Sequence, residues 1–367
     1  MKPPRLEIHL PVFNEEAHLP NLLSCLRRQT FEDFRVVIHD NGSTDATPDI
    51  CNEAAQVDAR FSLNRFPANL GPMAQGYRFR YGCKAEYVAC RSGNDLIADD
   101  YYEKTLALLE GDESIVLAYS YGTLIDENGA LCATPRDEDR IDTRGMEGPV
   151  ERASAVIRRY GYSFPLWGVY RRSALDRARS PQYSYGYDHV QVCEMALFGH
   201  VVSTQERLDY RRITRNEINF FPEGVASWAR QYSEEYARGV SPDSPYSSIA
   251  LHLPFTNMIW GHIETFSVAP VDDSIKPALA ACAVEIISER FGVYLRHEIE
   301  FFLSTIQREL PLLHDWLPRL SRDQRVIRLK KLRAEMDKLR VIPMAPQDVV
   351  TALDHQLVNL CHGSANA

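Results

Sequence analysis

The sequence predicts two parts: an α/β domain built on a mostly parallel, doubly wound sheet, and a mainly α-helical domain that follows it. In the first 120 of the 367 residues, short apolar runs alternate regularly with segments that are typical of helices. Such alternation is typical of parallel strands joined by helical crossovers. From residue 223 onward the periodicity is almost entirely helical. We therefore predict an α/β domain at 1–215 and a helical domain at 216–367.

The elements of the α/β domain follow from this periodicity in chain order. The apolar run at 6–10 predicts the first strand, and leucines at 19, 22, 23 and 26 give the helix expected at 15–28 one apolar face. A second strand at 34–38 leads to a helix at 44–57, for which Ser43 or Thr44 supplies the N-cap. The alternation continues with strands at 61–66, 87–90 and 115–119 and helices at 72–83 and 99–110.

The pattern changes after the fifth strand. Residues 126–150 are charged, contain glycine and show no periodicity, so we expect a surface excursion that closes over a site. The longest apolar stretch, at 249–260, is interrupted by polar residues and proline and is too short to span a bilayer. Helical periodicity in the second domain predicts helices at 225–236, 275–309 and 321–340.

Composition excludes several classes of protein. A hydrophobic fraction of 45% with 25% charged residues is ordinary for a globular chain with a real core. A net charge of −9 argues against general nucleic-acid binding, which requires a basic surface. The eight cysteines form no CxxC or Cys/His cluster, so no zinc or redox motif is expected. The chain starts directly with a strand and shows no signal peptide, which makes a cytoplasmic location the default expectation.

Polar residues gather where the predicted strands end. Helix capping and turn formation explain each cluster when it is considered alone. Because the carboxyl ends of parallel strands meet at one edge of a sheet, the clusters together predict a ligand site at that edge. They comprise residues 11–15, 39–45, 69–71 and 92–95.

These clusters resemble the motifs of the family 2 glycosyltransferases, which have the GT-A fold. Residues 11–15, Pro-Val-Phe-Asn-Glu, match the opening PxxNE motif, and residues 40–45, Asp-Asn-Gly-Ser-Thr-Asp, match DxGSxD. Asn69-Leu70-Gly71 matches the NxG turn of the family. Gly186-Tyr187-Asp188, followed by Met195-Ala196-Leu197 and Gly199, matches the ED…G helix. The resemblance covers about residues 5–215 and leaves the rest of the chain without an assignment.

The resemblance implies an inverting transferase that moves a sugar from a nucleotide-diphosphate sugar, with UDP as the expected nucleotide, to an acceptor hydroxyl. Surface polysaccharide or glycoconjugate synthesis is the common setting of such enzymes. Asp40 is expected to bind the edge of the base, and Glu15 to lie near the ribose. The other donor-binding candidates are Pro11, Val12, Phe13, Asn14, Asn41, Ser43, Asn69, Gly71, Asn94, Arg211 and Arg212.

The loop after the fourth strand departs from the family pattern. The family usually has Asp-x-Asp-Asp, whereas this chain has Ser92-Gly93-Asn94-Asp95 and retains only the last acid. One carboxylate suffices for Mg²⁺ or Mn²⁺ when substrate phosphates supply further ligands. We therefore expect Asp95 to bind the metal, with Asn94 as a further ligand or a partner of a sugar hydroxyl. The histidine that follows the family's "YR" pair is absent, because Ile213 or Thr214 stands in its place.

Asp188 is the candidate general base for the acceptor hydroxyl, which an inverting displacement needs on the face opposite the leaving group. Helix capping is the other interpretation of this residue, and Glu194 on the same predicted helix is a competing base. Tyr187 stands where the family usually has Glu, and is assigned to the acceptor site. Trp167, which precedes Gly168, either stacks on an acceptor sugar or belongs to the core.

Two basic features leave alternatives open. Arg211 and Arg212 either bind the donor diphosphate or are simple surface charges. Residues 317–340 contain nine basic and three acidic side chains. A helix here packs on its own domain, lies on the inner face of a membrane to meet a lipid-linked acceptor, or docks on a partner chain. The acceptor is expected to be a saccharide, a lipid-linked group or a protein, and a homo-oligomer is an open alternative.

Two other functions compete with glycosyl transfer. Ser92 and Asn94 motivate a catalytically degenerate protein that binds or assembles on nucleotide sugars without turnover. Such a protein would bind the donor but show no metal-dependent donor hydrolysis. A nucleotidyltransferase is disfavoured, because the first loop lacks the glycine-rich turn with Lys or Arg that cradles a triphosphate.

Overall fold

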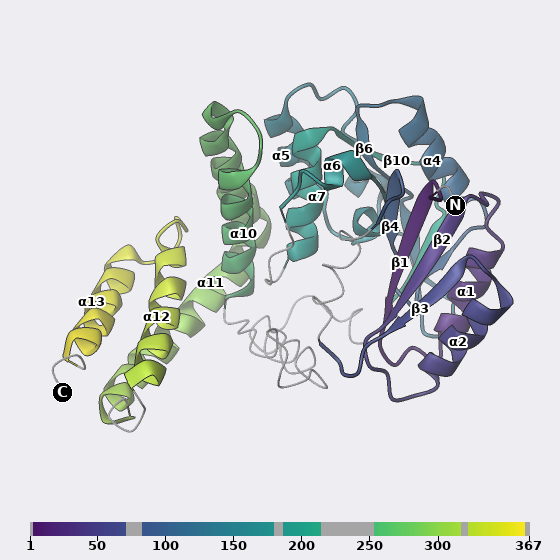
Figure 1. The fold of residues 1–367 in the computed structure, drawn as a ribbon. Coiled ribbons are helices and arrows are strands. Elements are labelled where there is room, and N and C mark those ends of the chain that lie inside the picture. The colour runs from purple at the N-terminus through teal and green to yellow at the C-terminus, as the bar shows by residue number, and fades with distance from the viewer. Residues whose placement is uncertain (1–2, 71–82, 180–185, 214–252, 317–321, 364–367) are drawn as a thin grey trace.

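The computed structural model describes residues 3–70, 83–179, 186–213, 253–316 and 322–363. A central sheet flanked by helices occupies one end of the molecule, and further helices extend away from it toward the C-terminus (Figure 1). The mixed α/β part with a parallel-rich sheet and the helical C-terminal part confirm the predicted fold class. The predicted boundary at 215/216 lies outside the described residues.

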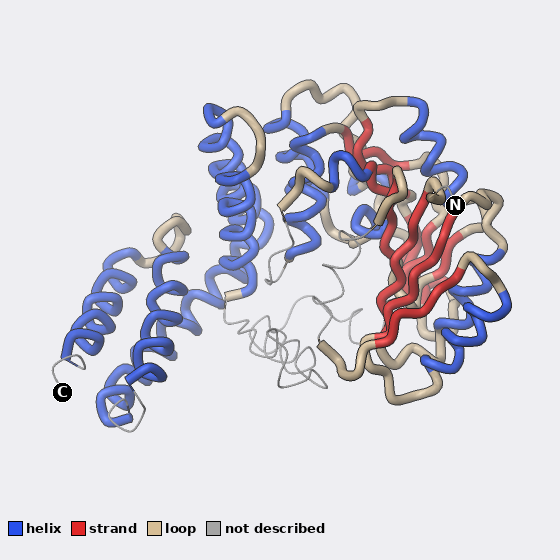
Figure 2. Tube along the Cα trace, in the orientation of Figure 1, coloured by secondary structure: helices blue, strands red, loops and turns tan. Residues whose placement is uncertain are grey.

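The main sheet has seven strands in the order β10-β6-β9-β4-β1-β2-β3. All neighbours are parallel except β9, which runs antiparallel between β4 and β6. Helices cover both faces of the sheet (Figure 2), and β4 and β6 are accordingly apolar runs, whereas β1 alternates apolar residues with Glu7, His9 and Pro11. The strands are β1 (Leu6–Val12), β2 (Phe34–Asp40), β3 (Phe61–Arg65), β4 (Tyr87–Cys90), β6 (Ile115–Tyr119), β9 (Val169–Arg171) and β10 (His200–Ser203).

A second, four-stranded sheet has the order β5-β11-β7-β8, and most of it was not predicted from the sequence. Its strands are two to four residues long, too short for a clear period of two. The expected excursion at 126–150 contributes the exposed strand β8 and the turn η1 (Asp137–Asp139). The strands are β5 (Leu96–Ile97), β7 (Gly122–Ile125), β8 (Leu131–Ala133) and β11 (Asp209–Arg212).

Two apolar cores lie on opposite faces of the main sheet. Along β1, Leu6, Ile8 and Leu10 enter the core that α1, α2 and α4 complete. The core on the other face contains residues of α5 and α7 and continues into α10 and α11. The helices of the α/β part are α1 (Leu19–Arg27), α2 (Thr47–Val57), α4 (Tyr101–Gly111), α5 (Pro149–Arg159), η2 (Phe164–Trp167), α6 (Arg172–Leu175) and α7 (Tyr187–Phe198).

Two of the predicted helices begin later than expected. Helix α1 starts at Leu19 rather than residue 15, because Asn14 adopts a positive φ of 53° in the preceding turn. The predicted N-cap of α2 is wrong: the helix starts at Thr47, whose N–H donates to Asp45 Oδ1 at 3.0 Å. Ser43 instead accepts a bond from the first loop. The helix expected at 72–83 falls almost wholly outside the described residues.

In the helical C-terminal part, α10 packs on α7 and α11 packs on α5. Helices α12 and α13 pack on each other, and they also contact α10 and α11, respectively. The sequence missed α10 because its residues are buried around most of its circumference, which leaves no polar face to set a helical period. Among the described residues, no helix is both long enough and apolar enough to cross a bilayer. The helices are α10 (Pro254–Val268), η3 (Asp273–Ile275), α11 (Lys276–Trp316), α12 (Arg322–Leu339) and α13 (Gln347–Gly363).

The basic segment predicted at 321–340 forms α12, and its described side chains bind within the helical part. Lys338 donates to Asn257 Oδ1 on α10 at 2.6 Å and to Glu335 at 2.7 Å. Arg333 and Arg340 both contact the carboxylate of Asp354 on α13. These contacts agree with a helix packed on its own domain.

Candidate functional site

The loops after β1 and β2 are joined at the carboxyl edge of the main sheet. The two strands are parallel with Val12 opposite Asp40, so both loops leave at the same level. Asn14 N–H donates to Ser43 Oγ at 3.0 Å, and Asn14 Oδ1 accepts from Thr44 N–H at 2.9 Å. The predicted motif residues Asn14 and Ser43 therefore fix each other across 29 positions of sequence.

Asp40 is fully buried at the end of β2. Its Oδ1 accepts from Ser43 N–H at 2.9 Å, and its Oδ2 lies 3.1 Å from Arg65 Nε at the end of β3. Arg65 also donates to the Ser43 carbonyl at 3.1 Å. The sequence did not single out Arg65, because its position in a strand carries no motif. The expected contact of Asp40 with a nucleotide base stays a prediction.

Asn41 ties the second loop to the segment after β3. Its Nδ2 donates to Asn69 Oδ1 at 2.8 Å, and its Oδ1 accepts from Leu70 N–H at 3.0 Å. Asn41 N–H donates to the Val12 carbonyl at 2.9 Å. The predicted donor residues of three strand ends therefore form one continuous edge, while Gly71 lies outside the described residues.

The loop after β4 approaches this edge closely at Gly93. A Cβ at this position would lie 3.1 Å from Val12 Cγ1 and 3.2 Å from Glu15 Cγ, so glycine permits the approach. Glu15 and Asp95 consequently lie in one partly buried acidic region. Burial raises the pKa of Glu15 to about 7, and the charges of Asp95 and Asp45 add to this effect.

Asp95 is only 2% exposed, and the second sheet places it beside Arg212. The antiparallel pairing of β5 with β11 brings residues 94 and 95 alongside 211 and 212. Asp95 Oδ1 accepts from Arg212 N–H at 2.8 Å, and Arg212 Nε donates to the Asn94 carbonyl at 2.9 Å. Burial raises the pKa of Asp95 to about 6, and the charge of Asp209 adds to this effect.

The side chain of Arg212 is committed to protein contacts in this structure. Its Nη1 donates to the Glu127 carbonyl at 2.8 Å and to the Asp126 carbonyl at 2.5 Å. It therefore anchors the beginning of the expected surface excursion next to the acidic loop. Arg211, its neighbour on β11, is partly exposed. Of the two predicted diphosphate ligands, Arg211 has the more accessible side chain.

Arg91 and Asp209 form a fully buried ion pair next to the loop at 92–95. The sequence did not indicate this pair. Arg91 Nη1 and Nη2 lie 2.8 and 3.0 Å from the two carboxylate oxygens of Asp209. The guanidinium also lies over the ring of Tyr101 at 5.1 Å and donates to the Trp167 carbonyl at 3.2 Å. The pair joins β4, β11 and η2, three elements that meet beneath the acidic loop.

Asp188 lies in the first turn of α7 and is partly exposed. Its Oδ2 accepts from the hydroxyls of Tyr160 and Ser163, each at 3.0 Å. Both donors lie between α5 and η2, and the carbonyl of Trp167, the last residue of η2, accepts from Arg91. The sequence missed both hydroxyl residues, because a Tyr and a Ser between a helix and a turn form no recognisable pattern.

The helical C-terminal part supports the start of α7. Gly186, the N-cap residue, has a φ of 74°, which favours glycine. A Cβ there would lie 2.6 Å from Met258 Cγ of α10. One residue after Asp188, the buried His189 contacts the buried His262 of α10 through Nδ1 and Nε2 at 2.8 Å. Burial holds the pKa of His189 at about 3, so this pair is neutral near pH 7.

The remaining acceptor candidates lie around η2 and α7. Trp167 ends η2, with a ring that is partly buried against the core, and Gly168 connects it to β9. Tyr187 precedes Asp188 in α7 and is partly exposed. Glu194, the competing base, is 3% exposed and accepts from Arg179 N–H at 2.6 Å. Glu194 therefore has a structural contact that suits it poorly to proton transfer.

The acidic region has the donor set of a Mg²⁺ or Mn²⁺ site. Oδ1 of Asp95 accepts the hydrogen bond from Arg212, and Oδ2 is the second carboxylate oxygen that could bind a cation. The carboxylate of Glu15 lies nearby. Hard oxygen ligands of this kind suit both ions. Burial is the main cause of the raised pKa values of both acids, and the charges of neighbouring acids add to it. The residues present therefore fit a divalent cation.

Comparison with known proteins supports the family resemblance. The sequence model of the family "Glycosyl transferase family 2" matches residues 7–130, which confirms the resemblance over this segment. EpsH of Bacillus subtilis, which is described as a glycosyltransferase, is 27% identical over 179 residues, covering 49% of this chain and 50% of EpsH. The succinoglycan biosynthesis protein ExoA of Rhizobium meliloti is 32% identical over 115 residues, covering 30% of this chain and 35% of ExoA. The chain thus spans half or less of these relatives.

The fold itself matches a solved structure over nearly the whole chain. The crystal structure of S. aureus TarS 1-349 in complex with UDP-GlcNAc superposes with a TM-score of 0.60 at 14% identity. The match covers 99% of this chain and 91% of the TarS chain. The likeness therefore confirms the fold and includes the helical C-terminal part.

Proposed function

We propose that this chain is an inverting glycosyltransferase that moves a sugar from a UDP-sugar to an acceptor hydroxyl. The observation that carries the proposal is the partly exposed Asp188, held through one carboxylate oxygen by Tyr160 and Ser163. The short segment η2 connects this carboxylate to the buried ion pair beneath the acidic loop. TarS, whose fold the chain shares, was crystallised with UDP and with UDP-GlcNAc, which supports the donor class.

The donor occupies the carboxyl edge of the main sheet in this proposal. The bonded loops after β1, β2 and β3 line the nucleoside, with Asp40 and Arg65 beneath them. Asp95 and Glu15 hold the divalent cation. When bound, the cation neutralises charge on the departing diphosphate. Arg211, the more exposed arginine of β11, contacts the same diphosphate.

Asp188 acts on the acceptor. Both hydroxyl donors bind its Oδ2, which leaves Oδ1 to accept the proton of the acceptor hydroxyl. As the new bond forms between the acceptor oxygen and the anomeric carbon, the bond from that carbon to the diphosphate breaks. The proton moves to Asp188, and the nucleoside diphosphate leaves with the bonding electron pair. Trp167 and Tyr187, near the start of α7, contribute to acceptor binding.

Replacing Asp188 by Asn tests the assignment. The amide keeps the size of the side chain but cannot accept the proton, so transfer falls by about 100-fold to 10,000-fold. Binding of UDP with Mn²⁺, measured by calorimetry, stays within twofold of the parent chain. Asp176→Asn, which changes an exposed aspartate paired with Arg172, serves as the matched control. Unchanged turnover of Asp188→Asn across a panel of UDP-sugars and acceptors would reject the role of the base.

The second candidate is a nucleotide-sugar-binding protein without turnover. It is favoured by Ser92 and Asn94, which replace the family's acids and bond to each other side chain to side chain. Such a protein binds UDP but gives no Mn²⁺-dependent hydrolysis of any UDP-sugar, whereas the transferase gives slow hydrolysis that Asp95→Asn abolishes.

The name of ExoA supports polysaccharide synthesis as the setting of the transferase. We also propose the division into domains at 1–215 and 216–367.

A further inference from the structure

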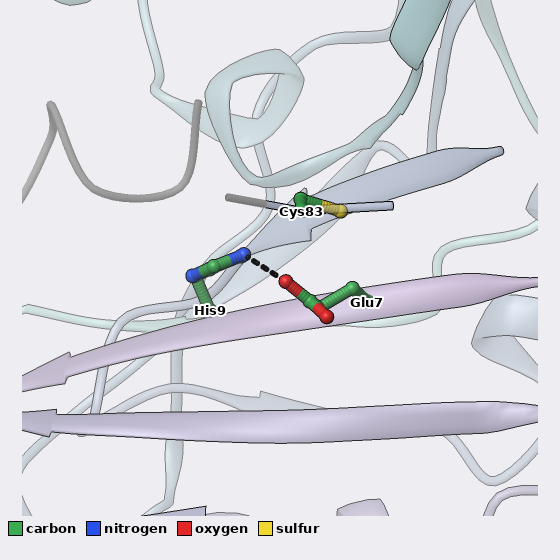
Figure 3. Close-up of side chains that lie close together, drawn as sticks. All are labelled: Glu7, His9 and Cys83. Atoms are coloured by element: carbon green, nitrogen blue, oxygen red, sulfur yellow. Dashed lines mark ion pairs between the residues drawn. The ribbon is translucent and has the colours of Figure 1, made fainter. Parts of the chain in front are cut away.

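We propose that Glu7, His9 and Cys83 form a zinc site on the main sheet. This site is separate from the donor edge, by which we mean the loops after β1, β2, β3 and β4 that form the proposed donor site. One ligand atom of each residue lies within 4.8 Å of the other two. Figure 3 shows Glu7 and His9 on β1, with their polar ends together, and Cys83 beside them on the segment that leads into β4. Each of the three residues is at most 4% exposed. The cluster therefore brings an oxygen, a nitrogen and a sulfur ligand together away from bulk water.

The placement follows from the sheet. Glu7 and His9 are two positions apart on β1, so they share the face opposite Leu6 and Ile8. Cys83 belongs to the core on that same face. Glu7 lies five residues before Val12, the last residue of the strand, or about 16 Å away at the usual rise of a strand. The cluster is therefore too distant to share a metal ion with Asp95.

The ligand types select zinc over the harder cations. Zinc binds carboxylate oxygen, imidazole nitrogen and thiolate sulfur, and sites with three protein ligands are common. Magnesium and calcium prefer oxygen alone. The combination of Glu, His and Cys thus differs in chemistry from the all-oxygen region at the donor edge. A zinc-specific site and a Mg²⁺ or Mn²⁺ site would coexist in one chain.

Arg35 and His39 orient the proposed ligands Glu7 and His9, in the way that hydrogen-bonded neighbours orient metal ligands. Arg35 forms an ion pair with Oε2 of Glu7, which leaves Oε1 directed at His9. His9 uses Nδ1 to contact His39 Nε2 at 2.9 Å, which fixes the ring and directs Nε2 toward Glu7 at 3.0 Å. A metal-bound histidine usually donates its other N–H to such a partner, and a bound carboxylate is likewise hydrogen-bonded.

Binding exchanges a hydrogen-bonded cluster for a coordinated one. Zinc binds the thiolate, and the thiol proton leaves to solvent. The two anionic ligands then balance the charge of the ion, and neutral His9 contributes the third bond. The site would fasten the segment before β4 to the start of β1.

Metal uptake by the purified full chain tests the site. Zinc added to the chelator-treated chain should bind at one ion per molecule, release about one proton and raise the melting temperature. Cobalt(II) in its place should give the near-ultraviolet absorption of a cobalt–thiolate bond. Cys83→Ser should abolish that absorption and weaken zinc binding at least tenfold, and His9→Gln should weaken it similarly. Circular dichroism of each variant establishes that it is folded.

Two control variants make the outcome specific. Cys90→Ser changes another buried, unpaired cysteine, seven residues along on β4, and should leave cobalt absorption unchanged. Asp95→Asn removes the proposed donor-edge ligand and should also leave zinc binding unchanged. The proposal is wrong if the parent chain takes up no zinc, or if Cys83→Ser binds zinc as tightly as the parent does. In that case Glu7 only forms ion pairs and hydrogen bonds with its neighbours. These readouts are independent of sugar transfer.

Discussion

The donor edge and the proposed base are built in different ways within one molecule. The donor edge consists of loops that leave neighbouring parallel strands, and residues far apart in sequence meet there because the strands are adjacent. Asp188 lies instead at the start of a helix whose position depends on helices outside the sheet. Gly186 contacts Met258, and His189 contacts His262, both on α10.

The two regions also differ in their electrostatics. At the donor edge, buried acids lie near one another, and the pKa values of Glu15 and Asp95 are raised to about 7 and about 6. Asp188 is partly exposed and receives two neutral hydroxyl donors. One region thus gathers acids that are buried or partly buried, and the other holds a single carboxylate through two hydrogen bonds. The sheet therefore brings the clustered acids together, whereas the helical part supports the helix that carries the proposed base.

The largest effect should come from breaking the ion pair beneath the donor edge. Asp209→Asn leaves the fully buried Arg91 without its charged partner, so we expect the free energy of unfolding to fall by about 3–5 kcal/mol. Urea or thermal unfolding measures the change. The exposed pair Lys104–Glu206 provides a matched control, since Glu206→Gln should cost less than about 1 kcal/mol. Similar losses in the two variants would show that the buried pair is not a main support of this region.

A pH-dependent contribution to stability should come from one carboxyl group of the helical part. Glu298 of α11 accepts from the N–H groups of Phe255 and Thr256 at 3.0 and 2.7 Å, which caps α10. Burial raises its pKa from 4.5 to about 7, against the opposing effect of these hydrogen bonds. Because the folded state holds this proton more tightly, the stabilisation is complete below pH 4.5. It is lost as the pH rises through 7, on the order of 3 kcal/mol in all.

The melting temperature between pH 5 and 8 measures this loss. Glu298→Gln stays neutral and can still accept through its carbonyl oxygen, so its melting temperature should vary less with pH than that of the parent. Glu289→Gln, on the same helix but exposed, should keep the parent profile. Parallel pH profiles of the parent and Glu298→Gln would contradict the assignment.

The smallest effect concerns the orientation of the proposed base. Tyr160→Phe removes one of two hydroxyl donors to Asp188, which corresponds to about 1 kcal/mol, or a five- to tenfold fall in kcat. Ser163→Ala should act similarly. Tyr162→Phe, two residues from Tyr160, is the control. UDP affinity should be unchanged in all three variants, because the proposal assigns Tyr160 and Ser163 to the base and not to the nucleotide. A loss of UDP affinity equal to the loss of kcat would place Tyr160 in the donor site instead.

The predicted fold and the predicted site were accessible to sequence reasoning to different extents. Strands such as 87–90 and 115–119 were predicted with the bounds that the structure shows, because buried parallel strands are short apolar runs. The loops after β1, β2 and β3 were found because their turn residues recur in the family motifs. The second sheet, α10 and the late start of α2 were not predicted. Their signals are short, uniformly apolar or overridden by contacts with other loops.

The sequence by itself determined the alternation of strands and helices, the polar residues at the strand ends and the family to which residues 7–130 are similar. These features are local, since hydrogen bonds within helices and turns and the burial of one strand depend on nearby residues. Only the tertiary structure paired Arg91 with Asp209, 118 positions away, and Tyr160 with Asp188, 28 positions away. It likewise joined Cys83 to Glu7 and His9. Such partners are chosen by the packing of whole elements, which no spacing within the chain records.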